Sequence, residues 1–424
     1  MLMNYIRHAL TMYMIMISSL HRKIFTIIIF FSILSSGQIS SDVINSDSLT
    51  LELETITKRG HINGLGVAMV DEKGTIYEKG FGFSDKDLKI PYTSQSIQNI
   101  ASISKTFLGL ALLKAQELGK LDLNDPVNKY LTFKVENPYY PEVPITIRQL
   151  TTHTSSIKDS KYYDQKSYVL KAGQKAQQSE KFNRPENFNP PEAFTSMGIF
   201  LKKCLENKGE WYTKKGFLKE KPGSKFEYSN VGATLAAYVL ELATGEDYGE
   251  FSAKYILEPL HMSSSGWSFE DINIEDHTVM YENTDQALPF YKLITYPDGG
   301  LITSVHDLAL YLTELIKGYA GNGTILSDES YQELFKQQLS EAHFDERDPD
   351  NPYNDEYNMG VFMGFSATGN IGHSGGDPGV TTLMFFNADK KTGQLIFVNT
   401  GMDEDGFQEF IDVWMKLESY RTKL

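Results

Sequence analysis

The stretch NIASISKTFLGLALL, residues 99–113, decides how this chain folds. It is almost wholly apolar beyond Ser102, so we expect a central, buried helix from Ser102 to about Leu118, which Gly119 ends. A serine at the start of a helix is usually a cap. Lys105 follows three residues later on the same side of the helix, where its amine can reach the serine hydroxyl. Ser102 is therefore either a cap or a nucleophile.

A nucleophilic serine needs more than a lysine three residues away. A serine hydroxyl attacks only when a base takes its proton, and a lysine is such a base only when its pKa is lowered. A helix N-terminus contributes partial positive charge, which favours an uncharged amine and a developing oxyanion. The same S-x-x-K spacing recurs at Ser155 and Lys158, without an apolar helix behind it. Taken alone, the pattern favours a cap and a surface lysine.

Tyr228-Ser229-Asn230 supplies further groups of the right kind. A tyrosine can share the proton of a serine–lysine pair, and an asparagine can orient the lysine and bind a substrate amide. The alternative is that Ser229 or Asn230 caps the apolar helix expected over Gly232–Leu242. The Y-x-N spacing recurs at residues 281–283, so it is weak by itself.

Residues 371–379, IGHSGGDPG, precede a strand expected from Val380. Glycines beside a strand let a substrate backbone approach closely. The N–H of Gly376 can form an oxyanion hole together with the N–H of Ser102. A plain glycine-rich turn is the favoured interpretation of this segment when it is taken alone.

Hydrophobic periodicity predicts strands near both ends of the chain and helices in the middle. The expected helices are Leu49–Arg59, Thr303–Ile316 and Phe407–Leu417, and the expected strands are 64–70, 75–82, 357–365, 380–387 and 394–400. Ser304 and Asp307 predict a capping box for the second of these helices. The sequence therefore predicts an α+β fold. An antiparallel sheet of N- and C-terminal strands is flanked by helices, and a mostly helical lobe is inserted at about 145–293.

Composition excludes several classes of function. The chain of 424 residues is 41% hydrophobic and can bury a sizeable core. Its net charge is −15 and no basic cluster follows residue 23, which argues against a nucleic-acid partner. Cys204 is the single cysteine, so no intrachain disulfide forms, and the scattered histidines match no metal motif. We expect no metal and no cofactor.

The N-terminus resembles an export leader. Residues 21–23 are basic, residues 24–34 are apolar, and residues 35–37 are small. Eleven apolar residues are short for a membrane span. We predict that residues 1–37 are a cleaved signal peptide, with an uncleaved N-terminal anchor as the alternative, and that residues 48–420 form the hydrolase domain. This predicts an exported bacterial protein, periplasmic or secreted, that contacts a membrane only through such an anchor.

The three motifs in the order S-x-x-K, Y-x-N and H-x-G resemble the serine beta-lactamase and penicillin-binding-protein superfamily. The resemblance is to its class C-like branch, which includes esterases and D-amino-acid peptidases. Three further segments are similar to those of the family, namely residues 119–127, 147–155 and 297–301. The resemblance extends from about residue 50 to residue 415, nearly the whole chain after the leader.

This resemblance implies a role for each motif residue. Ser102 is the acylated nucleophile, and Lys105 and Tyr228 are the general bases. The substrate site is formed by Asn230, which positions Lys105 and the substrate amide, and by His373, Ser374, Gly375 and Gly376. Gly376 stands at the position whose N–H completes the oxyanion hole, and Ser155 belongs to the family's H-T-S turn rather than to a nucleophile pair.

His373 departs from the family pattern, because many members carry the lysine of K-T-G there. Histidine titrates near neutrality and weakens the case for binding the carboxylate of a beta-lactam. The implied function is therefore hydrolysis of an ester or amide through an acyl-serine, by an esterase, a D-amino-acid peptidase or carboxypeptidase, or a weak beta-lactamase. The alternative is a non-hydrolytic penicillin-binding or cell-wall sensor protein. We expect a monomer whose partner is a small molecule or peptide with a carbonyl electrophile.

Overall fold

The computed structural model describes residues 46–174 and 188–421. The predicted leader, residues 1–37, lies outside these ranges, as does part of the long 158–221 stretch. Within the described ranges, no helix has both the length and the apolar character needed to cross a bilayer.

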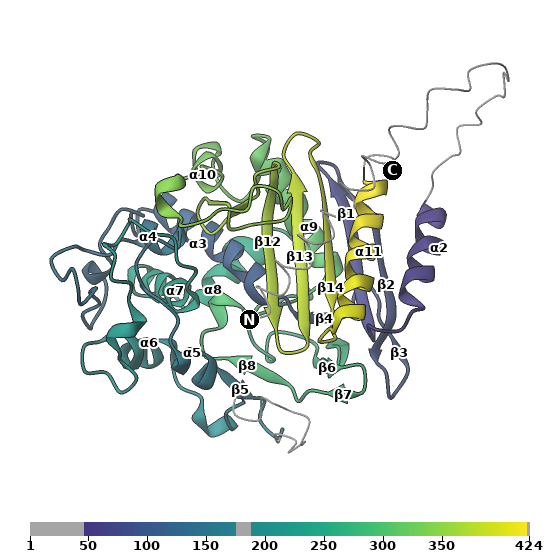
Figure 1. The fold of residues 1–424 in the computed structure, drawn as a ribbon, viewed down its shortest axis with the longest axis horizontal. Helices are drawn as coiled ribbons and strands as arrows, with labels where there is room; N and C mark the ends of the chain where they lie inside the picture. Colours follow the sequence, from purple (N-terminus) through teal and green to yellow (C-terminus); the bar gives the residue numbers. More distant parts are fainter. Residues whose placement is uncertain (1–45, 175–187, 422–424) are drawn as a thin grey trace.

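An eight-stranded sheet forms the body of the molecule (Figure 1). Its strand order is β10-β11-β12-β13-β14-β1-β2-β3, and neighbouring strands are antiparallel. The two ends of the chain meet where β1 (Gly64–Asp71) pairs with β14 (Thr392–Val398), with Leu65 opposite Val398. The remaining strands are β2 (Gly74–Asp85), β3 (Ile90–Pro91), β10 (Asn358–Met359), β11 (Gly364–Phe365), β12 (Asn370–Asp377) and β13 (Val380–Asn387). The predicted sheet of N- and C-terminal strands is confirmed.

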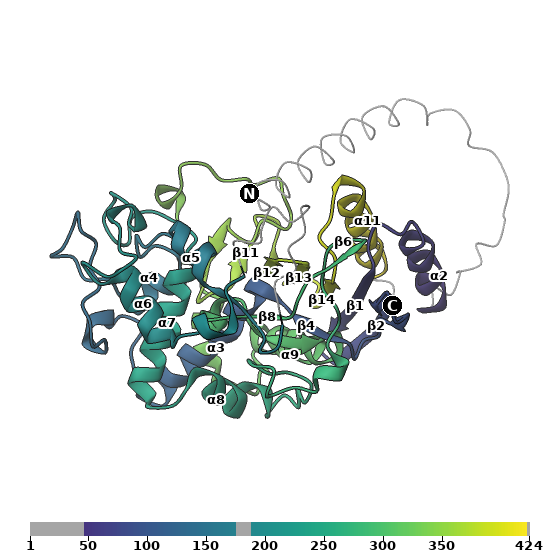
Figure 2. The same cartoon turned by 90° about the horizontal axis from the view of Figure 1, so that it is seen from below.

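Helices cover both faces of this sheet (Figure 2). On one face, α2 (Ser46–Thr57) packs beside α11 (Glu404–Tyr420), and both bury apolar side chains against β1 and β14. On the other face, α9 (Val305–Tyr319) contacts the same two strands. Ser304 caps α9 by accepting the N–H of Asp307 at 3.0 Å. The Asp307 carboxylate accepts from Ser264 and Ser265 rather than from the N–H of Ser304. The N-cap is therefore as predicted, but Asp307 does not supply the second bond of a capping box.

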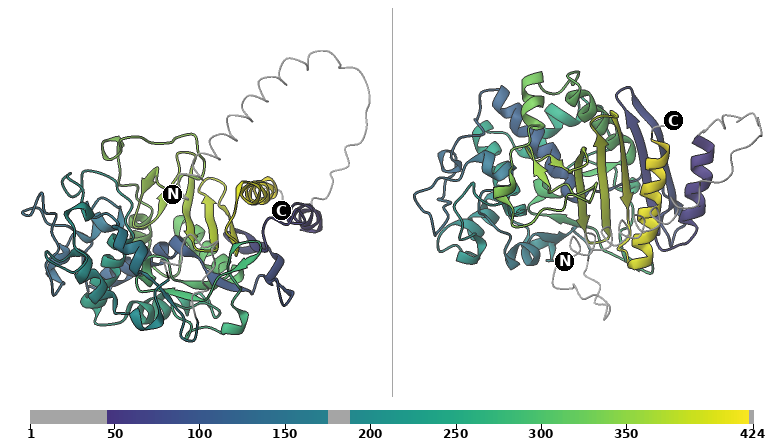
Figure 3. Two further views of the ribbon diagram at one scale, coloured as in Figure 1. Left: turned by 60° about the horizontal axis from the view of Figure 1, so that its bottom comes forward. Right: turned by 45° about the horizontal axis from the view of Figure 1, so that its top comes forward.

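A mostly helical lobe lies beside the sheet, and the described residues between α4 (Ile147–Thr151) and β8 (Tyr291–Leu293) form most of it (Figure 3). The short ladder of β4 (Ile97–Asn99) and β9 (Ile302–Ser304) links the sequence before and after the lobe. Its principal helices are α4, α5 (Lys161–Lys166), α6 (Met197–Leu205), α7 (Asn230–Thr244) and α8 (Tyr248–Ser252). Two short ladders accompany them, which the sequence did not predict: β5 (Tyr168–Leu170) with β8, and β6 (Tyr281–Asn283) with β7 (Gln286–Ala287). Strands of two or three residues carry too little periodicity to be recognised.

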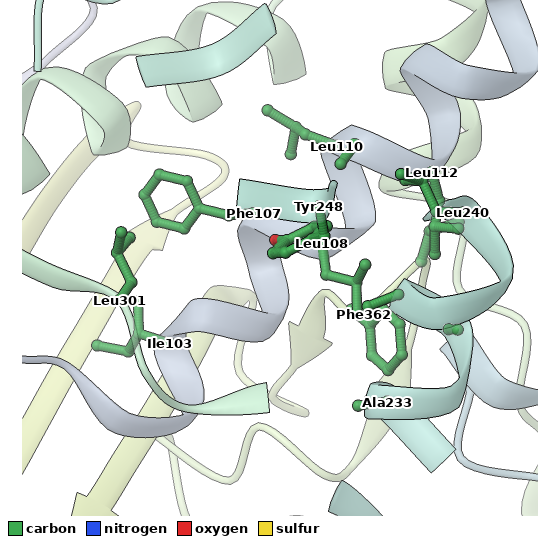
Figure 4. Close-up of a cluster of buried hydrophobic side chains, with 14 of the residues drawn as sticks. Ile103, Phe107, Leu108, Leu110, Leu112, Ala233, Leu240, Tyr248, Leu301 and Phe362 are labelled. Atoms are coloured by element: carbon green, nitrogen blue, oxygen red, sulfur yellow. The ribbon is translucent and has the colours of Figure 1, made fainter. Parts of the chain in front are cut away.

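The expected central helix is present as α3 (Ser104–Glu117), buried on all sides along most of its length. Figure 4 shows its apolar side chains packed against Leu240 of the lobe, Leu301 and Phe362. A single 3₁₀ turn, η1 (Ala101–Ile103), precedes it, and no side chain caps α3. Ser102 therefore does not cap the helix.

The glycine-rich segment that alone favoured a turn is a strand instead. Every residue of β12 pairs with β13, from Asn370 opposite Asn387 to Asp377 opposite Val380. Glycine is required because the strand lies directly on η1: a Cβ at Gly375 would be 2.5 Å from the Ile100 carbonyl oxygen. Close packing, rather than a turn, thus explains Gly375.

Candidate active site

Ser102 lies where η1 meets β12, with its side chain partly exposed. The preceding residue, Ala101, has a φ of 49°, a left-handed conformation that costs a non-glycine residue about 1–2 kcal/mol. Such local strain persists only where the surrounding structure imposes it, often at functional sites. It holds the Ser102 hydroxyl at the mouth of the site while α3 continues into the core.

Lys105 is fully buried on the first turn of α3. Its Nζ donates to Ser102 Oγ at 3.0 Å, to Asn230 Oδ1 at 2.7 Å and to the Asp298 carbonyl oxygen at 2.6 Å. These three acceptors match the three donors of an ammonium group. Burial alone lowers the pKa of Lys105, but Tyr228 and Asp298 raise it by more, so the net direction is upward. The lysine is therefore charged in the resting site, contrary to the lowered pKa that the base role requires.

Tyr228 stands beside this pair, just before α7. Its ring stacks on His153 with centroids 4.4 Å apart, and its centroid is 5.0 Å from Lys105 Nζ. Burial raises the pKa of the phenol, while Lys105 and Ser102 lower it, and the net direction is upward. Lys105 and Tyr228 thus both hold their protons at neutral pH.

Asn230 begins α7, and Ser229 is its N-cap, accepting the N–H of Gly232 at 2.9 Å. The cap predicted for this motif and the contact between Asn230 and Lys105 therefore coexist. The Nδ2 of Asn230 donates to Asp159 Oδ2 at 2.7 Å. Asp159, which the sequence analysis missed, follows directly after the second S-x-x-K and belongs to no motif that would have drawn attention to it.

Asp298 is a second residue whose role the sequence did not reveal, although its segment resembled the family. Besides the carbonyl that binds Lys105, its buried carboxylate accepts from Tyr163 at 2.9 Å and from Thr234 at 2.8 Å. Burial raises the pKa of Asp298 to about 6, against the opposing effect of Lys105. Asp298 thereby ties α3 to two helices of the lobe.

His373 lies on β12 and is almost completely buried. Its Nδ1 is 2.6 Å from the Ser374 carbonyl oxygen, a contact in which Nδ1 must carry the proton. Burial lowers the pKa of His373 although Asp355 opposes this, so the neutral ring presents Nε2 as an acceptor. Asp355, also missed from sequence, accepts the N–H of Ser374 at 2.6 Å and its hydroxyl at 2.9 Å.

The geometry of β12 places the Gly376 N–H at the open edge of the strand. The N–H of Ser374 points away from β13, since it donates to Asp355, and in a strand the N–H two residues later points the same way. The neighbour on that side, β11, pairs with β12 at Ile371 and Gly372 only. An added Cβ at Gly375 would meet Ile100 and Ala101, so β12 passes close to the start of η1 at this point.

The second S-x-x-K is not assembled in this way. Ser155 is buried and accepts the N–H of Ile157 at 3.3 Å, while Lys158 Nζ pairs with Glu227 at 3.3 Å. The structure thus brings Ser102, Lys105, Tyr228, Asn230 and the 373–376 segment together and leaves Ser155 and Lys158 apart. Across residues 46–174 and 188–421, no group of side chains is arranged to hold a metal ion.

This architecture is shared with penicillin-binding proteins and related enzymes of known structure. The octameric penicillin-binding protein homologue of Pyrococcus abyssi matches with a TM-score of 0.63 at 24% identity, over 88% of this chain and 78% of that one. D-amino acid amidase of Ochrobactrum anthropi SV3 matches with a TM-score of 0.61 at 18% identity, over 88% of this chain and 99% of that one. These likenesses establish the fold.

The sequence assigns the family. The Beta-lactamase family model matches residues 52–411, and the chain belongs to that family. Human serine beta-lactamase-like protein LACTB is 28% identical over 309 residues, covering 60% of this chain and 54% of that protein. Protein flp of Staphylococcus aureus is 26% identical over 260 residues, covering 60% of this chain and 46% of that protein. The chain spans about half the length of the curated relatives that it matches.

Proposed function

We propose that this chain is a serine hydrolase that cleaves an ester or amide through an acyl intermediate on Ser102. The observation that carries the proposal is the buried Lys105, whose Nζ joins Ser102 Oγ, Asn230 Oδ1 and the Asp298 carbonyl in one set of hydrogen bonds. A buried lysine is costly unless it is paired, and this one is paired with the hydroxyl of a partly exposed serine that follows the left-handed Ala101. A purely structural lysine has no use for that partner.

The protonation states of Lys105 and Tyr228 determine which group takes the serine proton in this proposal. The three N–H donors of Lys105 are all hydrogen-bonded, so Lys105 remains an ammonium. In the form that reacts, the proton lost from the Lys105–Tyr228 pair is therefore that of the Tyr228 phenol. The phenolate of Tyr228 then accepts the proton of Ser102 Oγ as that oxygen attacks the carbonyl, and the Lys105 charge stabilises both oxygens. The N–H groups of Ser102 and Gly376 receive the oxyanion. Tyr228 returns the proton to the leaving group, and water releases the acyl product.

The surroundings of His373 favour a substrate without a carboxylate next to the scissile bond. The charged group in contact with His373 and Ser374 is itself a carboxylate, that of Asp355, and the imidazole is neutral with Nε2 as an acceptor. This favours an esterase or an amidase over a carboxypeptidase or a beta-lactamase. One structural neighbour is named a D-amino acid amidase, and an amino-acid amide has no carboxylate at the scissile bond.

Intact-mass measurement after exposure to a fluorophosphonate tests the nucleophile. We expect one adduct on the wild-type chain and none on Ser102→Ala. A wild-type chain without an adduct, or an adduct on Ser102→Ala, would overturn the proposal.

Penicillin distinguishes the alternative function. A penicillin adduct that persists without turnover, in a chain that hydrolyses neither p-nitrophenyl esters nor D-amino-acid amides, would identify a sensor or penicillin-binding protein instead. Turnover of one of the two substrate panels decides between esterase and amidase.

A further inference from the structure

Asp159 makes a compact set of contacts at the start of α7. Its Oδ2 accepts from Asn230 Nδ2 at 2.7 Å and from the Asn230 backbone N–H at 3.1 Å. Its Oδ1 accepts from the Val231 N–H at 2.9 Å and from the Ser229 hydroxyl at 3.2 Å. All four partners donate, so the carboxylate acts purely as an acceptor.

We propose that Asp159 is a positioning residue that fixes the amide orientation of Asn230 and, through it, the state of Lys105. The proposal rests on the proposed hydrolase function, but it concerns a residue outside the three motifs. A side-chain amide has an oxygen and a nitrogen end of almost the same shape, and its neighbours alone decide which way it faces. Asp159 can only accept, so it selects the Nδ2 end, and the Oδ1 end is left to receive Lys105.

This orientation has a consequence for substrates. The resemblance to the family implied that Asn230 also binds a substrate amide. Here the Nδ2 group is engaged by Asp159, which draws that donor toward the lobe. Asn230 thus holds Lys105 through its oxygen while Asp159 binds one of its two Nδ2 donors, which leaves at most one donor for a substrate amide.

Asp159 also acts through its charge. Together with Tyr228 and Asp298, it raises the pKa of Lys105. A negative charge near the Lys105–Tyr228 pair disfavours loss of a proton from either member. Removing that charge therefore shifts the deprotonation of the pair to lower pH, even in a variant in which the reaction itself is slower.

Asp159→Asn provides the test, read out as the rate at which a fluorophosphonate labels Ser102 at a series of pH values. An amide at position 159 keeps one oxygen for Val231 and turns an NH₂ group toward Asn230. Asn230 then flips, and a nitrogen faces Lys105. We expect the maximal labelling rate to fall about 10- to 100-fold, as for a lost hydrogen bond to a charged group. We also expect the rise of the rate with pH to begin at lower pH.

Exchanging the two side chains distinguishes positioning from a structural role. Asn230→Asp alone sets two carboxylates against each other and slows labelling. Combined with Asp159→Asn, it again gives Lys105 an acceptor. The double variant also restores one carboxylate facing one amide at the start of α7, and with it the original net charge. We expect the double variant to recover to within about tenfold of the wild type, with the rise in rate returning to higher pH.

Asp403→Asn is the matched control, since Asp403 caps α11 by accepting the N–H of Gly406 at 2.9 Å and lies outside the site. It should lower stability slightly without moving the pH dependence. The inference is overturned if Asp159→Asn merely lowers the melting temperature with an unshifted pH profile, or if the double variant is no faster than either single one. Failure of the wild type to label would refute the hydrolase function instead, so the two failures are distinguishable.

Discussion

At the scale of single residues, the proposed mechanism makes the reactivity of Ser102 depend on the protons held by Lys105 and Tyr228. Burial raises the pKa of Tyr228, and the neighbouring Tyr228 and Asp298 raise the pKa of Lys105 against the opposing effect of burial, so both groups are protonated at neutral pH. His373 and His153 have lowered pKa values and are neutral there, so neither contributes to the titration above neutrality. The reactive form of the site is therefore a minor species at neutral pH.

This predicts that the labelling rate of Ser102 rises with pH, by about tenfold per unit below the pKa of the pair, from about pH 6 into the alkaline range. The reaction with the fluorophosphonate is stopped after a series of times at each pH. Intact mass then gives the fraction of chain labelled, and hence the rate. A rate that is flat from about pH 6 to 9 would mean that the pair has already lost a proton at neutrality, against the stated pKa directions.

His373→Lys tests the preference for uncharged substrates. A lysine ammonium near Ser374 would attract an anionic substrate group, and we expect the KM of an ester with a carboxylate in its acyl chain to fall about tenfold. The KM of the matched neutral ester should stay the same. His373→Gln, which carries no charge, is the control. Equal changes for both esters would show that position 373 does not select for charge.

The site residues differ in how far sequence reveals them. Ser102, Lys105, Tyr228 and Asn230 sit in short motifs whose combination is specific, and the structure brings them together. Asp159, Asp298 and Asp355 act on these motifs from elsewhere in the chain, and single carboxylates carry no spacing that would mark them. The raised pKa of Lys105 could not be predicted from the sequence either, because it depends on charged groups that lie near Lys105 only in the folded chain.

At the scale of elements, the contact between β12 and η1 would set the spacing of the two proposed oxyanion donors, the N–H groups of Ser102 and Gly376. A Cβ at Gly375 would lie 2.4 Å from Thr382 Oγ1 and 2.5 Å from the Ile100 carbonyl oxygen. The second of these is a backbone atom and cannot move without displacing η1. The separation of the two elements thus depends on the absence of a side chain at this position.

Gly375→Ala should push β12 away from η1 and carry the Gly376 N–H out of reach. We expect the labelling rate to fall about 100-fold, as for the loss of one oxyanion donor. Gly216→Ala is the matched control, since the nearest atoms to a Cβ there are 4.0 Å away. Normal labelling by Gly375→Ala would show that the N–H of Gly376 is not needed.

Elements with a clear period were predictable and the short or glycine-rich ones were not. The sequence predicted α2, α7, α9, α11, β1, β2 and β13 with ends close to those observed. The strand expected over 357–365 is reduced to β10 and β11, and Phe362 between them has a left-handed φ of 52°. For β12, local composition favoured a turn. The contact that makes glycine necessary is with Ile100, 275 residues earlier than Gly375 (375 less 100).

At the scale of the whole molecule, the sheet separates two apolar cores. One contains α3, α9 and the lobe, and the other lies between the sheet, α2 and α11. In the second core, Leu53 of α2 is 0% exposed, whereas Leu51 of the same helix is 65% exposed. The active site lies against the first core, so changes in the second should alter stability without altering chemistry.

Leu53→Ala should lower the free energy of unfolding by about 2–5 kcal/mol, the usual result of truncating a buried leucine. Leu51→Ala should change it by less than about 0.5 kcal/mol, because that side chain is exposed. Urea denaturation measures both. The labelling rate of Ser102 in the absence of urea should equal that of the wild type in each variant, and a marked loss in Leu53→Ala would show that the two cores are coupled.

The pairing of β1 with β14 also sets an order of events during synthesis of the chain. Leu65 and its partner Val398 are 333 residues apart, 398 less 65. At about 5–20 residues per second, β1 waits roughly 20–70 s on the ribosome before β14 exists. Throughout that interval the hairpin of β1 and β2 has an unpaired edge, which is a template for aggregation. The edge of β1 that faces β14 therefore stays unpaired with its native partner until translation is nearly complete.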